Sequence, residues 1–64
     1  MNFNQIEKLL IKNGWFLVRT IGSSHQYRKL GNLETVIISN RGNEVFSDYF
    51  LIHLEKTTGL SLMR

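Results

Sequence analysis

The stretch NGWFLVRT, residues 13–20, joins the end of a helix to the start of a strand and decides the fold. Gly14 can adopt the left-handed backbone conformation that ends a helix, and Trp15 just after it can fold back onto Leu10. From Trp15 to Thr20 most side chains are aromatic or branched, as strands favour. The chain is therefore expected to change from helix to sheet at this point.

A helix is expected before this stretch. Apolar residues recur at helical spacing over Ile6–Leu10, and Asn4 followed three residues later by Glu7 resembles a capping box. The pattern predicts a helix from about Gln5 to Asn13.

Two further strands are expected after it. Polar and larger residues alternate from Ser24 to Leu30, and a branched run lies at the centre of Glu34 to Ser39. The segments Ile21–Ser23 and Gly31–Asn32 carry turn residues between the strands. The three strands are expected to pair as an antiparallel meander.

A second helix is expected near the C-terminus. Ser47 can cap a helix that runs to Thr58 and ends at Gly59, with Leu51 and Leu54 facing the core. The sequence thus predicts one α+β domain over residues 1–64. Its two-layer architecture has the order α-β-β-β-α, with two helices on one face of a three-stranded antiparallel sheet.

Composition narrows the class of function. The 64 residues include eight Lys and Arg against five Asp and Glu, and the resulting net charge of +3 favours polyanionic partners such as nucleic acid. There is no cysteine and there are two histidines, so we expect chemistry without a metal or another cofactor. The sequence shows neither an apolar run of membrane-spanning length nor a signal-peptide pattern, so we expect a cytoplasmic protein without membrane contact.

The densest group of reactive side chains lies in GSSHQYRK, residues 22–29. In a strand, His25, Tyr27 and Lys29 share one face. His25 could act as a general base on a ribose 2′-hydroxyl, with Lys29 holding the phosphate and Tyr27 stacking on a base. The residues alone favour a plainer alternative, in which Tyr27 is a core residue, His25 a hydrogen-bonded edge residue and Lys29 a surface charge.

Several nearby residues could hold RNA around this group. Arg19 and Arg28 supply positive charge, and the turn at Gly22, Ser23 and Ser24 could present backbone amides to a phosphate. The default interpretation of that segment is an ordinary turn. His53, in the second helix, is expected at the surface.

Two strands are apolar on both alternating faces. The segments Trp15–Val18 and Val36–Ile38 carry more apolar side chains than a sheet with one wet face requires. We expect either a protein partner or the loops and the tail, residues 61–64, to cover the excess.

The order of these signals resembles the HicA (YcfA-like) family of toxins. The resemblance spans about Gln5 to Leu60 and rests on NGWFLVRT, on Gly-Ser with a nearby histidine and Tyr27, and on Leu51, Leu54, Gly59 and Leu60. It implies a double-stranded-RNA-binding-like fold and a ribosome-independent mRNA interferase. It also implies a HicB antitoxin that blocks the toxin and covers its exposed apolar surface.

The sequence departs from the family pattern at the site itself. The commonest pattern has histidine directly after Gly-Ser, where this chain has Ser24, and a variant with one intervening residue makes His25 the catalytic residue. The third strand of family members usually ends in Pro-His, whereas Ile38 is followed by Ser39 here. Glu55 stands where an apolar residue is usual. These differences indicate a divergent member.

The leading hypothesis is therefore a metal-independent endoribonuclease toxin with His25 as general base and with Arg19, Arg28 and Lys29 supplying positive potential. Two alternatives stay open. The first alternative is a non-catalytic RNA-binding module of the same fold, with Ser24 in place of the active histidine, and the second is a domain whose apolar surface binds an antitoxin protein.

Overall fold

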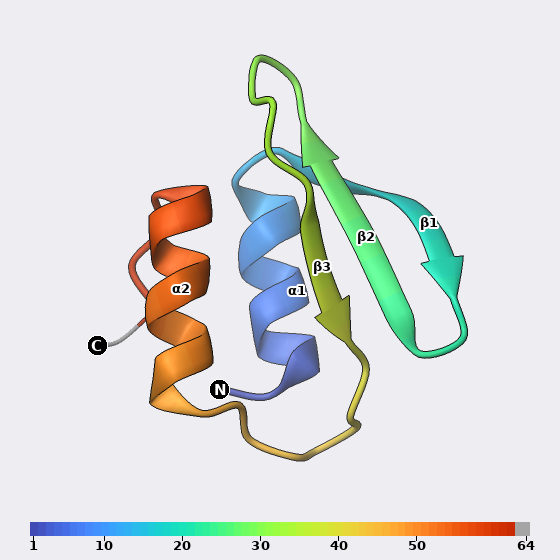
Figure 1. Ribbon diagram of the computed structural model, residues 1–64, viewed down its shortest axis with the longest axis vertical. Helices are drawn as coiled ribbons and strands as arrows, with labels where there is room; N and C mark the ends of the chain where they lie inside the picture. Colours follow the sequence, from blue (N-terminus) through green and yellow to red (C-terminus); the bar gives the residue numbers. More distant parts are fainter. Residues whose placement is uncertain (63–64) are drawn as a thin grey trace.

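The computed structural model describes residues 1–62 and shows two helices beside a small sheet (Figure 1). The elements are α1 (Phe3–Lys12), β1 (Trp15–Ile21), β2 (Ser24–Lys29), β3 (Val36–Ser39) and α2 (Asp48–Thr58). The strands are antiparallel in the order β1-β2-β3, so β2 is central. The predicted α-β-β-β-α order and the three-stranded antiparallel sheet are confirmed.

The first helix begins earlier than predicted. Its N-cap is Asn2, whose side-chain oxygen accepts the backbone N–H of Gln5 at 3.0 Å, while the Gln5 side chain accepts the Asn2 N–H at 2.9 Å. The proposed capping box of Asn4 with Glu7 is wrong. The earlier start places Phe3 inside the helix, where its ring is buried against the core.

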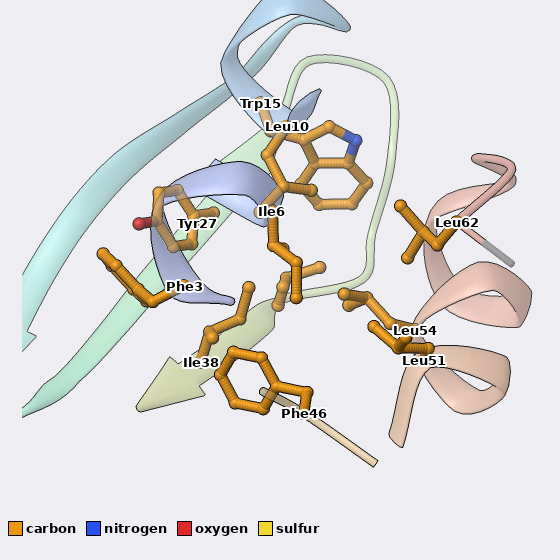
Figure 2. Packing of buried hydrophobic residues seen from close by; sticks show 11 residues of the cluster. Phe3, Ile6, Leu10, Trp15, Tyr27, Ile38, Phe46, Leu51, Leu54 and Leu62 are labelled. Carbon is orange, nitrogen blue, oxygen red and sulfur yellow. The ribbon is translucent and has the colours of Figure 1, made fainter. Parts of the chain in front are cut away.

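The end of this helix follows the prediction. Gly14 has a positive φ of 93°, and its N–H donates to the carbonyl of Ile11 at 3.2 Å. Trp15 is 1% exposed and lies against Leu10 in the core (Figure 2). This contact clamps the start of β1 onto α1.

The third strand is shorter than predicted because a local turn removes its first residues. The Asn32 side-chain oxygen accepts the backbone N–H of Glu34 at 2.8 Å, and the Asn32 N–H donates to the Lys29 carbonyl at 3.1 Å. These bonds compete with strand pairing. β2 therefore ends at Lys29 and β3 begins at Val36.

The second helix has the predicted start and end. The Ser47 hydroxyl oxygen accepts the N–H of Phe50 at 3.2 Å, and Gly59 ends the helix at a φ of 76°. Glu55, which departs from the family pattern, accepts the backbone N–H of Leu62 on its carboxylate at 2.6 Å. Its charge therefore fastens the segment after α2 to the helix.

The core lies between the sheet and the two helices (Figure 2). It draws on all five elements and on the segments after β3 and α2. Its buried members are Phe3, Ile6, Leu10, Trp15, Tyr27, Val36, Ile38, Phe46, Leu51, Leu54 and Leu62. Because Leu62 packs in this core, this part of the tail does not cover the outer sheet face, and residues 63 and 64 lie outside the described part of the chain.

Candidate functional site

His25 lies on the helix-facing side of β2, close to the turn that joins β1 and β2. Its ring is half-buried, and its centroid lies 4.8 Å from that of Phe3 at an interplanar angle of 57°. Its Nδ1 is 3.1 Å from the carbonyl oxygen of Ser23. A carbonyl oxygen only accepts, so this contact is a hydrogen bond when Nδ1 carries the proton. In the neutral ring Nε2 then keeps a free lone pair, which is the form a general base needs.

The Ser23 carbonyl that contacts His25 is itself held in place. The Ser23 carbonyl also accepts the backbone N–H of Asn40 at 2.8 Å, which ties the β1–β2 turn to the end of β3. The orientation of the imidazole is thus set by the backbone of a constrained turn and by the ring of Phe3. The sequence analysis missed Phe3, which is 22 positions away, because such a contact depends on how α1 lies across β2.

Tyr27 is a core residue. It is 0% exposed, and its hydroxyl donates to a carboxylate oxygen of Glu7 at 2.5 Å. Burial, reinforced by the hydrogen bond and the negative charge of Glu7, raises the pKa of Tyr27 well above its ordinary value. The expectation that Tyr27 stacks on a base is wrong, because α1 covers its ring. The plainer alternative was correct for this residue.

Lys29 shares the face of His25 but lies at the other end of β2. Four strand positions separate the two residues, a distance of roughly 13 Å. The stem of Lys29 runs past Gly14, where an added Cβ would meet its Cε at 3.3 Å. With buried Tyr27 between them, His25 and Lys29 do not converge on one phosphate. The predicted common face is present, but the helix packed on it divides the expected group of three.

The outer face of the sheet gathers the two arginines of β1 and β2. Arg28 pairs with Phe16, and Arg19 pairs with Gln26, so all four residues share the face opposite the helices. Ser24 belongs to the same face by strand alternation. This outer face therefore combines positive charge with an exposed aromatic ring. The sequence analysis did not single out Phe16 or Gln26, whose roles depend on strand register.

A bulge in β1 determines which face Arg19 occupies. The register shifts between Leu17 and Arg19, which leaves Val18 as the extra residue. A strand without this shift would pair Arg19 with His25, whereas Thr20 takes that place here. A shift of one residue exchanges the two faces of a strand. The bulge therefore puts the arginine on one side of the sheet and the histidine on the other.

The remaining candidates lie at the surface. Gly22 has a φ of 58° and, with Ser23, forms the exposed turn between β1 and β2. His53 is exposed on α2, as expected. Among residues 1–62, no three His, Asp or Glu side chains lie close enough to hold a metal ion. The helices described here are too short and too polar to cross a membrane.

The excess of apolar side chains is real. Phe16, Ile21 and Ile37 are 44%, 56% and 55% exposed. By register they belong to the outer face that carries Arg19 and Arg28. Such a surface, apolar and basic together, is typical of a binding site.

Comparison with known proteins gives one match. A family model described as the HicA toxin of bacterial toxin-antitoxin matches residues 3–60. No curated protein and no solved structure matches the chain. The family match covers all five elements of the fold, including the turn that holds His25.

Proposed function

The chain belongs to the HicA family of toxins from bacterial toxin-antitoxin systems, and we propose that it is an endoribonuclease with His25 as its general base. Membership of this family supports a toxin role and implies an antitoxin partner. The hydrogen bond from His25 Nδ1 to the Ser23 carbonyl is the observation that carries the catalytic part of the proposal. It leaves Nε2 as the proton acceptor in a side chain that is only half-buried.

The proposed reaction is a transesterification within RNA. His25 Nε2 takes the proton of a ribose 2′-hydroxyl, and the 2′-oxygen forms a bond to the adjacent phosphorus. The bond from phosphorus to the 5′-oxygen of the next nucleotide breaks, and that oxygen takes a proton from water. The products are a 2′,3′-cyclic phosphate and a 5′-hydroxyl. No step requires a metal ion.

The outer face is the proposed RNA track. Arg19 and Arg28 would neutralise phosphates there, and Phe16 offers a ring on which a base can stack. The RNA strand would pass over the exposed turn at Gly22 and Ser23, around the end of the β1–β2 hairpin, to reach His25. Lys29 would contribute positive potential without touching the reacting phosphate, because it lies at the far end of β2.

A second candidate function is RNA binding without cleavage. This function is supported by the separation of the cations from the histidine, since Arg19 and Arg28 lie on the sheet face opposite His25. Ser24, which occupies the position of histidine in the commonest family motif, lies on the same face as the arginines. A chain that had lost its active histidine would keep this outer face for RNA.

One assay separates the two functions. The purified chain is incubated with a long single-stranded RNA in excess EDTA, beside the variants His25→Ala, Ser24→Ala and His53→Ala, with folding checked by circular dichroism. We expect His25→Ala to lower the cleavage rate by about 10²–10⁴-fold, the usual contribution of a general base. The exposed His53→Ala is the matched control and should cleave like the unmodified chain.

Two results would contradict the catalytic proposal. If His25→Ala cleaved as fast as His53→Ala, the base would be another group. If the unmodified chain bound the RNA but left it intact, the second candidate would stand. We further propose that the antitoxin is HicB-like, that it covers the outer face, and that the pair acts in the cytoplasm, where the mRNA substrate is found.

A further inference from the structure

A groove runs between β3 and α2. Two cavities of about 500 and 210 Å³ lie along it, and both are lined by Ile37 and Phe50. Ser39 lines the larger cavity, and Thr35 and His53 line the smaller one. Figure 1 shows β3 at the edge of the sheet nearest α2, with β1 forming the opposite edge. The groove therefore follows a sheet edge.

The backbone of β3 is unpaired along this edge. The N–H of Asn40 donates to the Ser23 carbonyl at 2.8 Å, and by register Ser23 lies opposite Asn40, so this is a hydrogen-bonded position of the β2–β3 ladder. In an antiparallel ladder the bonded pairs alternate, so Ile38 also bonds β2 whereas Ile37 and Ser39 point their N–H and C=O groups outward. Within residues 1–62, β3 pairs with β2 alone. Both residues with outward backbone groups, Ile37 and Ser39, line the groove.

Half of the residues that line the larger cavity are apolar. Phe46 and Phe50 stack with ring centroids 4.8 Å apart, and Val45 and Ile37 are largely exposed beside them. Unpaired backbone groups next to exposed apolar side chains are what an added strand requires. Its main chain would bond β3, and its alternate side chains would enter the two cavities.

The lining of the larger cavity carries one cation and one carboxylate. Arg41 lines the larger cavity, and its ion pair with Glu44 spans 3.5 Å between side chains that are both more than half exposed. Such a pair contributes little, so Arg41 can take another carboxylate. The three strands contain the cations Arg19, Arg28 and Lys29 and no Asp or Glu. Glu44 lines the same cavity as Arg41, so the positive charge that would attract an acidic partner lies on the adjoining outer face, with Arg19 and Arg28, and not in the groove.

We propose that an extended segment of the antitoxin adds to β3 as a fourth strand in this groove. A polypeptide fits the edge because its own N–H and C=O groups alternate at the spacing of the outward groups of β3. Ile37 belongs both to the outer face and to the groove, so a partner on that face would reach this edge without a gap. The inference rests on the antitoxin partner implied by the family and not on the ribonuclease proposal.

Amide hydrogen exchange tests the proposal at the residues concerned. Exchange is measured by NMR on the free chain and on its purified complex with the antitoxin. We expect the amides of Ile37 and Ser39 to exchange at least about tenfold more slowly in the complex, because each gains a hydrogen bond. The Ile38 amide, already bonded to β2, is the internal control. Unchanged exchange at Ile37 and Ser39, or protection confined to β1, would overturn the proposal.

A pair of variants tests the same edge through affinity. Ile37→Asp places a negative charge in the groove, and Ile11→Asp is the matched control, since both side chains are more than half exposed and Ile11 lies on α1. We expect antitoxin affinity to fall at least about tenfold in Ile37→Asp alone. Equal affinities would refute the added strand. Because this experiment measures binding and not cleavage, its result can be interpreted even if the chain proves not to be a ribonuclease.

Discussion

The bond between Tyr27 and Glu7 connects β2 to α1 inside the core, and we predict that Tyr27→Phe will measurably weaken the fold. The substitution removes the hydroxyl that donates to the Glu7 carboxylate at 2.5 Å and keeps the buried ring. A hydrogen bond to a charged group contributes about 1.5–3 kcal/mol. The half-buried carboxylate also loses its partner, so we place the expected loss near the middle of that range.

The expected loss is large for so small a domain. A core of this size supplies about 3–5 kcal/mol, so Tyr27→Phe should remove roughly half of the free energy of unfolding. For a chain of this length each kcal/mol corresponds to about 4–8 °C, so a loss of about 2 kcal/mol lowers the melting temperature by roughly 8–16 °C. The residue linking the helix to the central strand thus carries an unusual share of the stability.

The same bond predicts a dependence on alkaline pH. Burial and Glu7 raise the pKa of Tyr27 in the folded state above the ordinary value of about 10. A raised pKa means that the unfolded chain loses its proton first, so the contribution of Tyr27 is fully present below about pH 10 and is lost progressively above it. In Tyr27→Phe this part of the alkaline loss should be absent.

Thermal and urea denaturation followed by circular dichroism, at neutral pH and above pH 10, measure both effects. Tyr49→Phe is the matched control, because the Tyr49 ring is 85% exposed. The control should unfold like the unmodified chain. If Tyr27→Phe were as stable as Tyr49→Phe at neutral pH, the bond to Glu7 would not stabilise the fold and the reasoning would be refuted.

Three further predictions concern a cap, a turn and the outer face. Asn2→Ala should cost about 1 kcal/mol in urea denaturation because it removes the N-cap of α1, and an unchanged midpoint would place the helix start elsewhere. Gly14→Ala should destabilise more than Gly22→Ala, because a φ of 93° lies farther from the left-handed well than 58° and the new methyl would meet Lys29 at 3.3 Å. Equal losses would contradict this order. Arg28→Gln should weaken binding to single-stranded RNA and make the slope of log affinity against log salt concentration shallower by about 0.7. An unchanged slope would mean that Arg28 does not contact a phosphate.

The sequence predicted the elements that depend on local signals. Gly14 and Gly59 end helices at positive φ, and Ser47 caps α2, because such caps need a particular residue at one position. The predicted start of α1 was wrong because Asn2 and Asn4 have the same side chain, and either can cap a helix. Burial of Phe3 decides between them, and burial depends on the sheet that the helix covers.

The candidate site was less predictable because it depends on pairing between strands. Alternation correctly placed His25, Tyr27 and Lys29 on one face of β2, but the pattern did not show that α1 would cover this face. Histidine and lysine are common at protein surfaces, so their presence did not indicate that this face of β2 packs against a helix. The carboxylate that meets Tyr27 comes from Glu7, a contact that exists only after α1 packs on β2.

The bulge at Val18 has the largest functional consequence. Pairing without it would set Arg19 opposite His25 and give the histidine a neighbouring cation for the charge that develops on phosphate. With it, Arg19 joins Arg28 on the outer face and His25 is left beside Phe3 and the β1–β2 turn. Cleavage by this chain would therefore require RNA to reach His25 around the hairpin end, while binding needs the outer face alone. Affinity for RNA and cleavage of RNA should accordingly respond to different substitutions, the first to the arginines and the second to His25.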